Sequence, residues 1–172
     1  HHPHVDVHRR QRVSDPLQRH PRPLRVGVAL CVLAATVLAS LASCARGIPV
    51  TLPDGASSPA CAALEPLWPR TVSGRETRAV DPISPAARAW GDPAIIAICG
   101  YAAPPPSTLE CVSVDGVDWV VQPRSNGVQF TTYGREPALD VLVPSAYAPE
   151  PLVLPAFGAA ARSLPATGRT CQ

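Results

Sequence analysis

The residues that could do chemistry are unevenly distributed in this chain of 172 residues. All five histidines lie within the first 20 residues, and the chain has no lysine. Beyond residue 44 the sequence therefore offers no Ser-His-Asp or Cys-His nucleophilic site, no histidine-based metal centre and no Schiff-base lysine. It also lacks a glycine-rich phosphate loop. Catalysis by this part would have to depend on carboxylates, for which Asp92, Asp115 and Asp118 are the candidates.

Each of these carboxylates also has a structural explanation. Asp115 precedes Gly116, and Asp-Gly is a common hairpin turn. Asp92 precedes a proline, where its side chain can accept hydrogen bonds from free backbone groups. Asp118 could be neutralised by Arg135 on the same sheet face. We therefore assign no catalytic residue, no metal site and no cofactor from the sequence.

Charge limits the class of partner. The formal net charge is +2, which is too small for a protein that binds nucleic acid through a general basic field. Residues 1–43 carry six arginines against two acidic residues, whereas residues 44–172 carry nine arginines against eleven. The basic excess therefore precedes the part that is expected to fold.

An uncharged run of 18 residues extends from Val26 to Ser43, and six arginines precede it. Its length suits a secretory signal and is marginal for a membrane-spanning helix. The run ends in Leu41-Ala42-Ser43-Cys44, which resembles the bacterial lipobox, in which a dedicated peptidase cuts before a cysteine that carries diacylglycerol. We expect lipidation at Cys44; the alternatives are an uncleaved single-pass anchor and ordinary cleavage near Ala42. All three place the rest of the chain on the extracytoplasmic face of the membrane.

These patterns divide the chain into four parts. Residues 1–25 are rich in His, Arg and Pro without apolar periodicity, so we expect a disordered basic region. Residues 26–44 form the signal or transmembrane segment, and residues 45–58 form a linker. Residues 59–172 form a single exported domain.

Four cysteines fall within the exported domain, and an even number in an oxidising compartment predicts two disulfides. Three connectivities are possible. We favour Cys99–Cys111, because the three consecutive prolines between them indicate a loop that joins two strands. Cys61–Cys171 would then tie the start of the domain to its end. Cys31 lies inside the apolar run and should stay unpaired.

The domain is predicted to be α+β. Apolar runs and turn residues predict strands over 94–99, 111–114, 117–122, 127–133 and 139–143. Ser-Pro pairs at 58–59 and 84–85 predict the starts of two short helices, the second carrying Ala86 to Trp90, and Pro155 starts a third. The expected architecture is an antiparallel β-meander of about four to five strands with short flanking helices, clipped by disulfides.

Alternation along the hairpin predicts its two faces. If Gln122 lies opposite Gly127, then one face carries the apolar residues Val117, Trp119, Val121, Val128 and Phe130 and belongs to the core. The other face is polar and aromatic. We interpret it as a candidate binding surface, formed by Asp118, Thr131, Tyr133 and Arg135, with Asp92 as a further member.

Three spaced segments carry a resemblance to a known family. They are Trp90 to Ala94 followed by Cys99-Gly100, then Val114 to Trp119, and Phe130 to Arg135. In this order, behind a signal and lipobox, the chain resembles the actinobacterial domain-of-unknown-function family 3515 of small exported proteins over most of residues 59–165. The resemblance implies an exported, envelope-associated protein, and it implies no activity.

Two functions are consistent with these observations. The first is a non-enzymatic envelope lipoprotein that binds an envelope protein or a cell-wall component while its lipid or single-pass helix holds it on the membrane. The alternative is a carboxylate-dependent hydrolase that acts on cell-wall glycan, which would need two carboxyl groups about 5–9 Å apart across a cleft.

Overall fold

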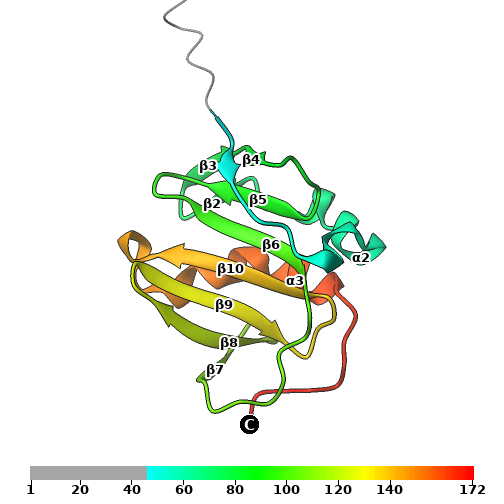
Figure 1. Cartoon of the computed structure of the whole chain (residues 1–172). Helices are drawn as coiled ribbons and strands as arrows, with labels where there is room; N and C mark the ends of the chain where they lie inside the picture. The colour runs from blue at the N-terminus through cyan, green and yellow to red at the C-terminus, as the bar shows by residue number, and fades with distance from the viewer. Residues whose placement is uncertain (1–45) are drawn as a thin grey trace, which may run out of the picture. The chain divides into compact units, whose positions relative to one another are not determined.

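The computed structural model describes residues 46–172, and its main element is an eight-stranded antiparallel sheet. In spatial order the strands are β2 (Thr71–Val72), β3 (Arg75–Arg78), β5 (Ala87–Trp90), β6 (Ile95–Tyr101), β10 (Ala138–Pro144), β9 (Gly127–Tyr133), β8 (Val117–Arg124) and β7 (Cys111–Val114). A separate parallel pair, β1 (Ile48–Pro49) with β4 (Val80–Asp81), lies beside the upper strands in Figure 1. The predicted strands are present, but the sheet is larger than four to five strands.

The chain does not run through the sheet as one continuous meander. After β6 it crosses to the far edge at β7 and then returns through β8 and β9 to β10, which pairs with β6. Long-range pairing of this kind leaves no local signal in a sequence. The sequence analysis missed the short strands β1 to β4, since strands of two to four residues have too few positions to show an alternation.

One predicted helix is a strand. The residues that follow Ser84-Pro85 form β5, which pairs with β6 from Ala87 opposite Ile98 to Trp90 opposite Ile95. Alanine favours helices, but tertiary pairing overrides that weak preference. The two faces of β5 are both buried, so its small side chains fit between the sheet and the segment that covers it.

The other two predicted helices are present and short. Helix α2 (Pro59–Ala62) begins after Ser58, whose hydroxyl oxygen accepts a hydrogen bond from the Cys61 amide at 3.3 Å. A 3-10 helix η4 (Glu150–Phe157) continues into α3 (Gly158–Ser163). The remaining 3-10 turns are η1 (Asp54–Ser57), η2 (Glu65–Leu67) and η3 (Ser145–Tyr147). In Figure 1 the η4–α3 segment lies behind β10 and β9.

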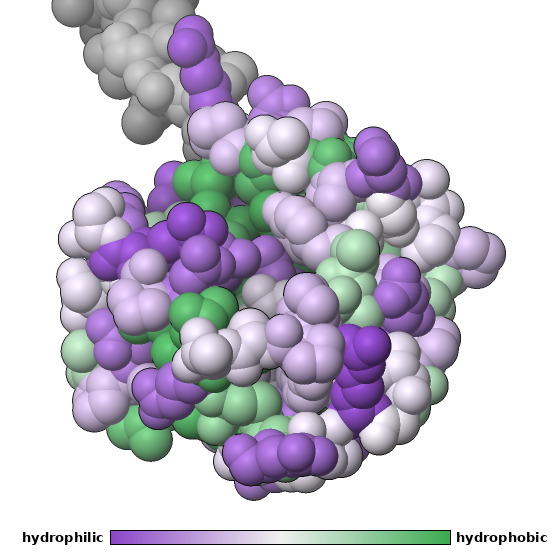
Figure 2. Space-filling model, turned by 60° about the horizontal axis from the view of Figure 1, so that its bottom comes forward, coloured by the Kyte–Doolittle hydropathy of each residue, from purple (hydrophilic) through white to green (hydrophobic). Residues whose placement is uncertain are grey.

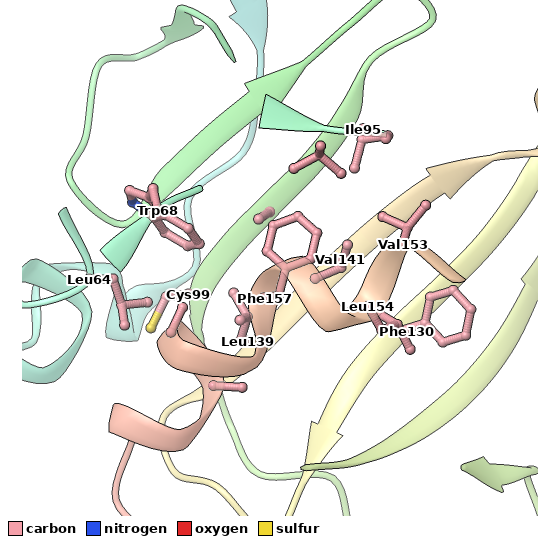
Figure 3. Close-up of a cluster of buried hydrophobic side chains, with 14 of the residues drawn as sticks. Leu64, Trp68, Ile95, Cys99, Phe130, Leu139, Val141, Val153, Leu154 and Phe157 are labelled. Atoms are coloured by element: carbon pink, nitrogen blue, oxygen red, sulfur yellow. The ribbon is translucent and has the colours of Figure 1, made fainter. Parts of the chain in front are cut away.

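The main core lies between the sheet and these short helices. Figure 3 shows Phe157 from η4 among Leu139 and Val141 of β10, with Leu64 and Trp68 to one side. The Phe157 ring also meets Trp90 edge to face at a centroid distance of 5.2 Å. All of these side chains are buried. A second, smaller apolar cluster covers the opposite face of β5 and β6 and includes Ala87, Ala89 and Ile98.

The stretch 45–58, predicted to be a linker, contributes structure from residue 46 onward. Ile48 and Val50 pack against the smaller apolar cluster, and η1 crosses β6 with backbone against backbone. At Gly100 the φ angle is +125°, and a side-chain carbon there would lie 2.3 Å from the Ala56 nitrogen. Only glycine fits both requirements, which explains why Gly100 follows the strand.

The predicted disulfide pairing is wrong. The structure has Cys61–Cys99 and Cys111–Cys171. Strands β10, β9 and β8 separate β6 from β7, so Cys99 and Cys111 are four strand spacings apart, about 19 Å. A disulfide requires Cα atoms within about 7 Å. The two cysteines also point to opposite faces, because Cys99 belongs to the main core whereas Cys111 pairs with Val120.

Several sequence predictions lie outside the described residues. These are the basic region 1–25, the apolar run 26–43 with Cys31, and the lipobox cysteine Cys44. Among residues 46–172, no helix has the length and apolar character needed to cross a bilayer.

Candidate functional site

The β8–β9 hairpin positions the predicted surface. Its loop is the two-residue turn Ser125-Asn126, and Arg124 lies opposite Gly127. The predicted register, with Gln122 opposite Gly127, is therefore wrong by two residues. A shift of two keeps every side chain on its face, so the predicted division into an apolar and a polar face is confirmed. Asp118 lies directly opposite Tyr133.

We call the polar side of β8, β9 and β10 the open face; it carries Asp118, Val120, Gln122, Gln129, Thr131, Tyr133 and Asp140. Three of the five predicted surface residues therefore lie together: Asp118, Thr131 and Tyr133. Figure 2 views the molecule from the lower side of Figure 1, where strongly polar and apolar residues share a hollowed surface.

Asp118 and Arg135 form no ion pair in the described structure, contrary to the neutralisation considered from the sequence. One Asp118 oxygen accepts a hydrogen bond from the Ser113 hydroxyl, and the other accepts one from the Cys171 amide at 2.7 Å. The Arg135 guanidinium instead donates to the carbonyls of Arg162 and Leu164, at 3.2 and 2.7 Å, where α3 ends. Asp118 and Arg135 thus fasten the C-terminal segment rather than face a ligand.

A groove of about 650 Å³ lies at one end of the open face. Its floor is formed by Val120 and Tyr133, and its walls are the 106–111 segment and the final stretch 168–172. The Cys111–Cys171 disulfide joins these two walls. Leu109, 46% exposed, gives the groove an apolar side, while Arg169 and Glu110 give it charges of both signs. The groove has the size of a site for a small ligand or a short peptide segment.

The open face also holds a buried carboxylate that the sequence analysis missed. Asp140 of β10 is 4% exposed. The Thr131 hydroxyl donates to one carboxylate oxygen at 2.6 Å, and the Gln129 amide donates to the other at 2.7 Å. Arg124 donates in turn to the Gln129 oxygen. A signal did exist, since Asp140 is the only charged residue in the apolar stretch 138–144.

Burial sets the protonation of this group. Removal from water raises the pKa of Asp140 from 3.8 to about 6, and the hydrogen bond from Thr131, the Arg124 charge and the hydrogen bond from Gln129 lower it only in part. Burial also raises the pKa of the Tyr101 hydroxyl, and the Asp140 charge adds to that rise. The Asp140 carboxyl therefore changes charge near neutral pH.

Asp92 does not belong to this surface. It follows β5 at the end of the sheet opposite Asp118 and Tyr133, its side chain is 91% exposed, and it lies 3.8 Å from the Arg78 guanidinium. Asp115 occupies the β7–β8 turn with a φ of +51°, which is the conformational role that the Asp-Gly sequence predicts.

The arrangement offers limited chemistry. Arg124 is the only charged side chain that acts on the pKa of Asp140, so no second carboxylate shares its site. Within residues 46–172 no group of three or more His, Cys, Asp or Glu residues is placed to hold a metal ion. What the open face provides is a hydrogen-bonding surface with an adjoining groove.

Comparison with known families agrees with the three spaced motifs. The family described as "Protein of unknown function (DUF3515)" matches residues 23–167. The chain belongs to this DUF3515 family. Neither a curated protein nor a solved structure matches the chain. Cys99-Gly100 and the β8–β9 hairpin, which carry the resemblance, are also the segments that build the β6–η1 crossing and the open face of this DUF3515 protein.

Proposed function

We propose that this DUF3515 protein is an exported envelope lipoprotein, anchored through Cys44, whose folded domain is a binding module for an envelope protein or a cell-wall component. The observation that carries the binding role is the groove beside the open face. It combines an apolar floor, charged rims and a polar neighbouring surface, which is the usual composition of a recognition site.

Export is supported by the two disulfides. Disulfides persist in oxidising compartments and are rare in the cytosol. Both native pairs have Cα–Cα distances of 5.5–5.6 Å, which are ordinary for a disulfide. Together with the apolar run and the lipobox, they favour the extracytoplasmic face of the membrane as the site of action.

The hydrolase alternative has less support. Hydrolysis of a glycosidic bond uses two carboxyl groups about 5–9 Å apart on either side of the substrate. Asp140 is the one carboxyl whose raised pKa would suit a general acid, but it is 4% exposed and both of its oxygens already accept hydrogen bonds. These contacts favour a structural role for Asp140 in the binding surface.

Anchoring is tested by Cys44→Ala in the full chain. If Cys44 carries the lipid, the variant should lose lipid incorporation and accumulate as uncleaved precursor. Intact-mass measurement of the membrane fraction reports both changes. An unchanged mass and unchanged processing would refute the anchoring.

The binding role is tested by mild crosslinking in cells followed by co-purification. Tyr133→Ala removes the aromatic floor of the groove and should abolish the crosslinked species. Tyr147→Ala is the matched control, because Tyr147 is also half-buried but lies at the other end of the sheet, with its hydroxyl donating to the Pro93 carbonyl. Equal crosslinking by both variants, at equal thermal stability, would rule out the groove as the binding site.

A further inference from the structure

The folded domain begins beside β4. The Ile48 amide donates to the Ala79 carbonyl at 2.8 Å, and the Val50 amide donates to the Asp81 carbonyl at 2.9 Å. These bonds fix the start of the chain in the domain at the top of the view in Figure 1, next to β3 and β4. Whatever holds the preceding residues therefore acts on this edge of the domain.

The connection to Cys44 is short. Cys44 precedes Ile48 by four residues, which can span at most about 14 Å. A domain of this size has a radius of gyration of about 14 Å. If Cys44 bears a lipid, as the proposed function holds, the domain cannot turn its β1–β4 surface far from the bilayer.

This surface presents an exposed apolar side chain. Ile83, two residues after Asp81, is 91% exposed and is the most exposed large hydrophobic residue between positions 46 and 172. Its loop is held on both sides, by the Val50–Asp81 bond and by the Trp68 indole, which donates to the Pro85 carbonyl at 2.9 Å. A single exposed isoleucine is common, but this one is held rigidly near the point where the chain enters the domain.

We propose that the β1–β4 surface docks on the bilayer and that Ile83 inserts into its interfacial region. This inference rests on the proposed anchoring at Cys44. Full burial of one isoleucine would favour docking about thirtyfold, which is too little to recruit a free protein. A short tether raises the local concentration of the surface to about the millimolar range, where such a weak contact is populated.

The charges around this surface predict how the docking depends on lipid. Arg46 and Arg78 are the nearby cations, and Glu76, Asp81 and Asp92 are the nearby anions. Because the two signs nearly balance, anionic lipid should change the docking little. A docking driven by arginines would instead grow about fivefold for each cation near an anionic surface.

The experiment uses tryptophan quenching in vesicles. The lipidated full chain is reconstituted into phosphatidylcholine vesicles that contain brominated lipid, with and without phosphatidylglycerol. The native Trp68, Trp90 and Trp119 are at most 8% exposed, so they give a low background. Ile83→Trp places a reporter on the proposed contact. Leu152→Trp is the matched control, because Leu152 is 73% exposed but lies on η4, over the other face of the sheet.

The expected result is several-fold stronger quenching for Ile83→Trp than for Leu152→Trp, in both lipid mixtures. Equal quenching of the two variants in a chain whose mass shows the diacylglycerol would overturn the docking and leave the anchoring intact. A chain without diacylglycerol that fails to stay with the vesicles would overturn the anchoring, and the docking with it.

Discussion

The Asp140 carboxyl should make the stability of this protein depend on pH in an identifiable way. Burial raises its pKa from 3.8 in the unfolded chain to about 6 in the fold. The folded state therefore holds this proton more tightly than the unfolded state does. The corresponding stabilisation is complete below about pH 4 and is lost as the pH rises through 6, by about 3 kcal/mol in total.

The perturbation is Asp140→Asn, which stays neutral throughout this range. The amide still accepts a hydrogen bond from Thr131, but its NH₂ group meets the donating Gln129 amide, which lowers stability by a constant amount. The measured quantity is the difference in free energy of unfolding between wild type and variant, obtained by urea unfolding with tryptophan fluorescence at several pH values. Between pH 4 and 7 the wild type should lose about 3 kcal/mol relative to the variant.

Asp92→Asn is the control, since it removes a carboxylate that is 91% exposed. It should run parallel to the wild type over the same pH range. If Asp140→Asn also runs parallel, the carboxyl is hydrated or ionised in the fold, and the reasoning from burial is wrong. A ¹³C titration of the Asp140 carboxyl follows the same proton directly.

Two further predictions concern covalent and backbone constraints. Limited dithiothreitol followed by alkylation and peptide mapping should open Cys111–Cys171 first, because both of its cysteines are half-buried whereas Cys61 and Cys99 are 0% exposed; simultaneous opening would contradict this order. Gly100→Ala should lower the free energy of unfolding by more than about 2 kcal/mol, because its φ of +125° and its contact with η1 both exclude a side chain, and thermal unfolding at wild-type temperature would refute that argument.

The local parts of this structure follow from the sequence. The apolar alternation of the β8–β9 hairpin, its Asp-Gly turn and the Ser-Pro start of α2 each depend on neighbouring residues, and each is found as predicted. The open face with Asp118, Thr131 and Tyr133 follows from the same alternation. Because a strand repeats every two residues, even a register wrong by two preserved those faces.

Tertiary structure decided what joins distant segments. The insertion of β10 beside β6 separates Cys99 from Cys111 and brings Cys61 to Cys99 instead. The same insertion places Asp140 beside Thr131 and creates the one buried carboxylate. Arg135 is drawn to the end of α3 for a similar reason.

The sequence by itself determined the family, the strand faces and the number of disulfides, because these depend on residue types and on spacings of a few positions. The order of strands, the partner of each cysteine and the burial of Asp140 depend on which hydrophobic surfaces meet across the whole domain. That choice is settled by the combined packing of the main core on both sides of β10, and no single stretch of the chain encodes it.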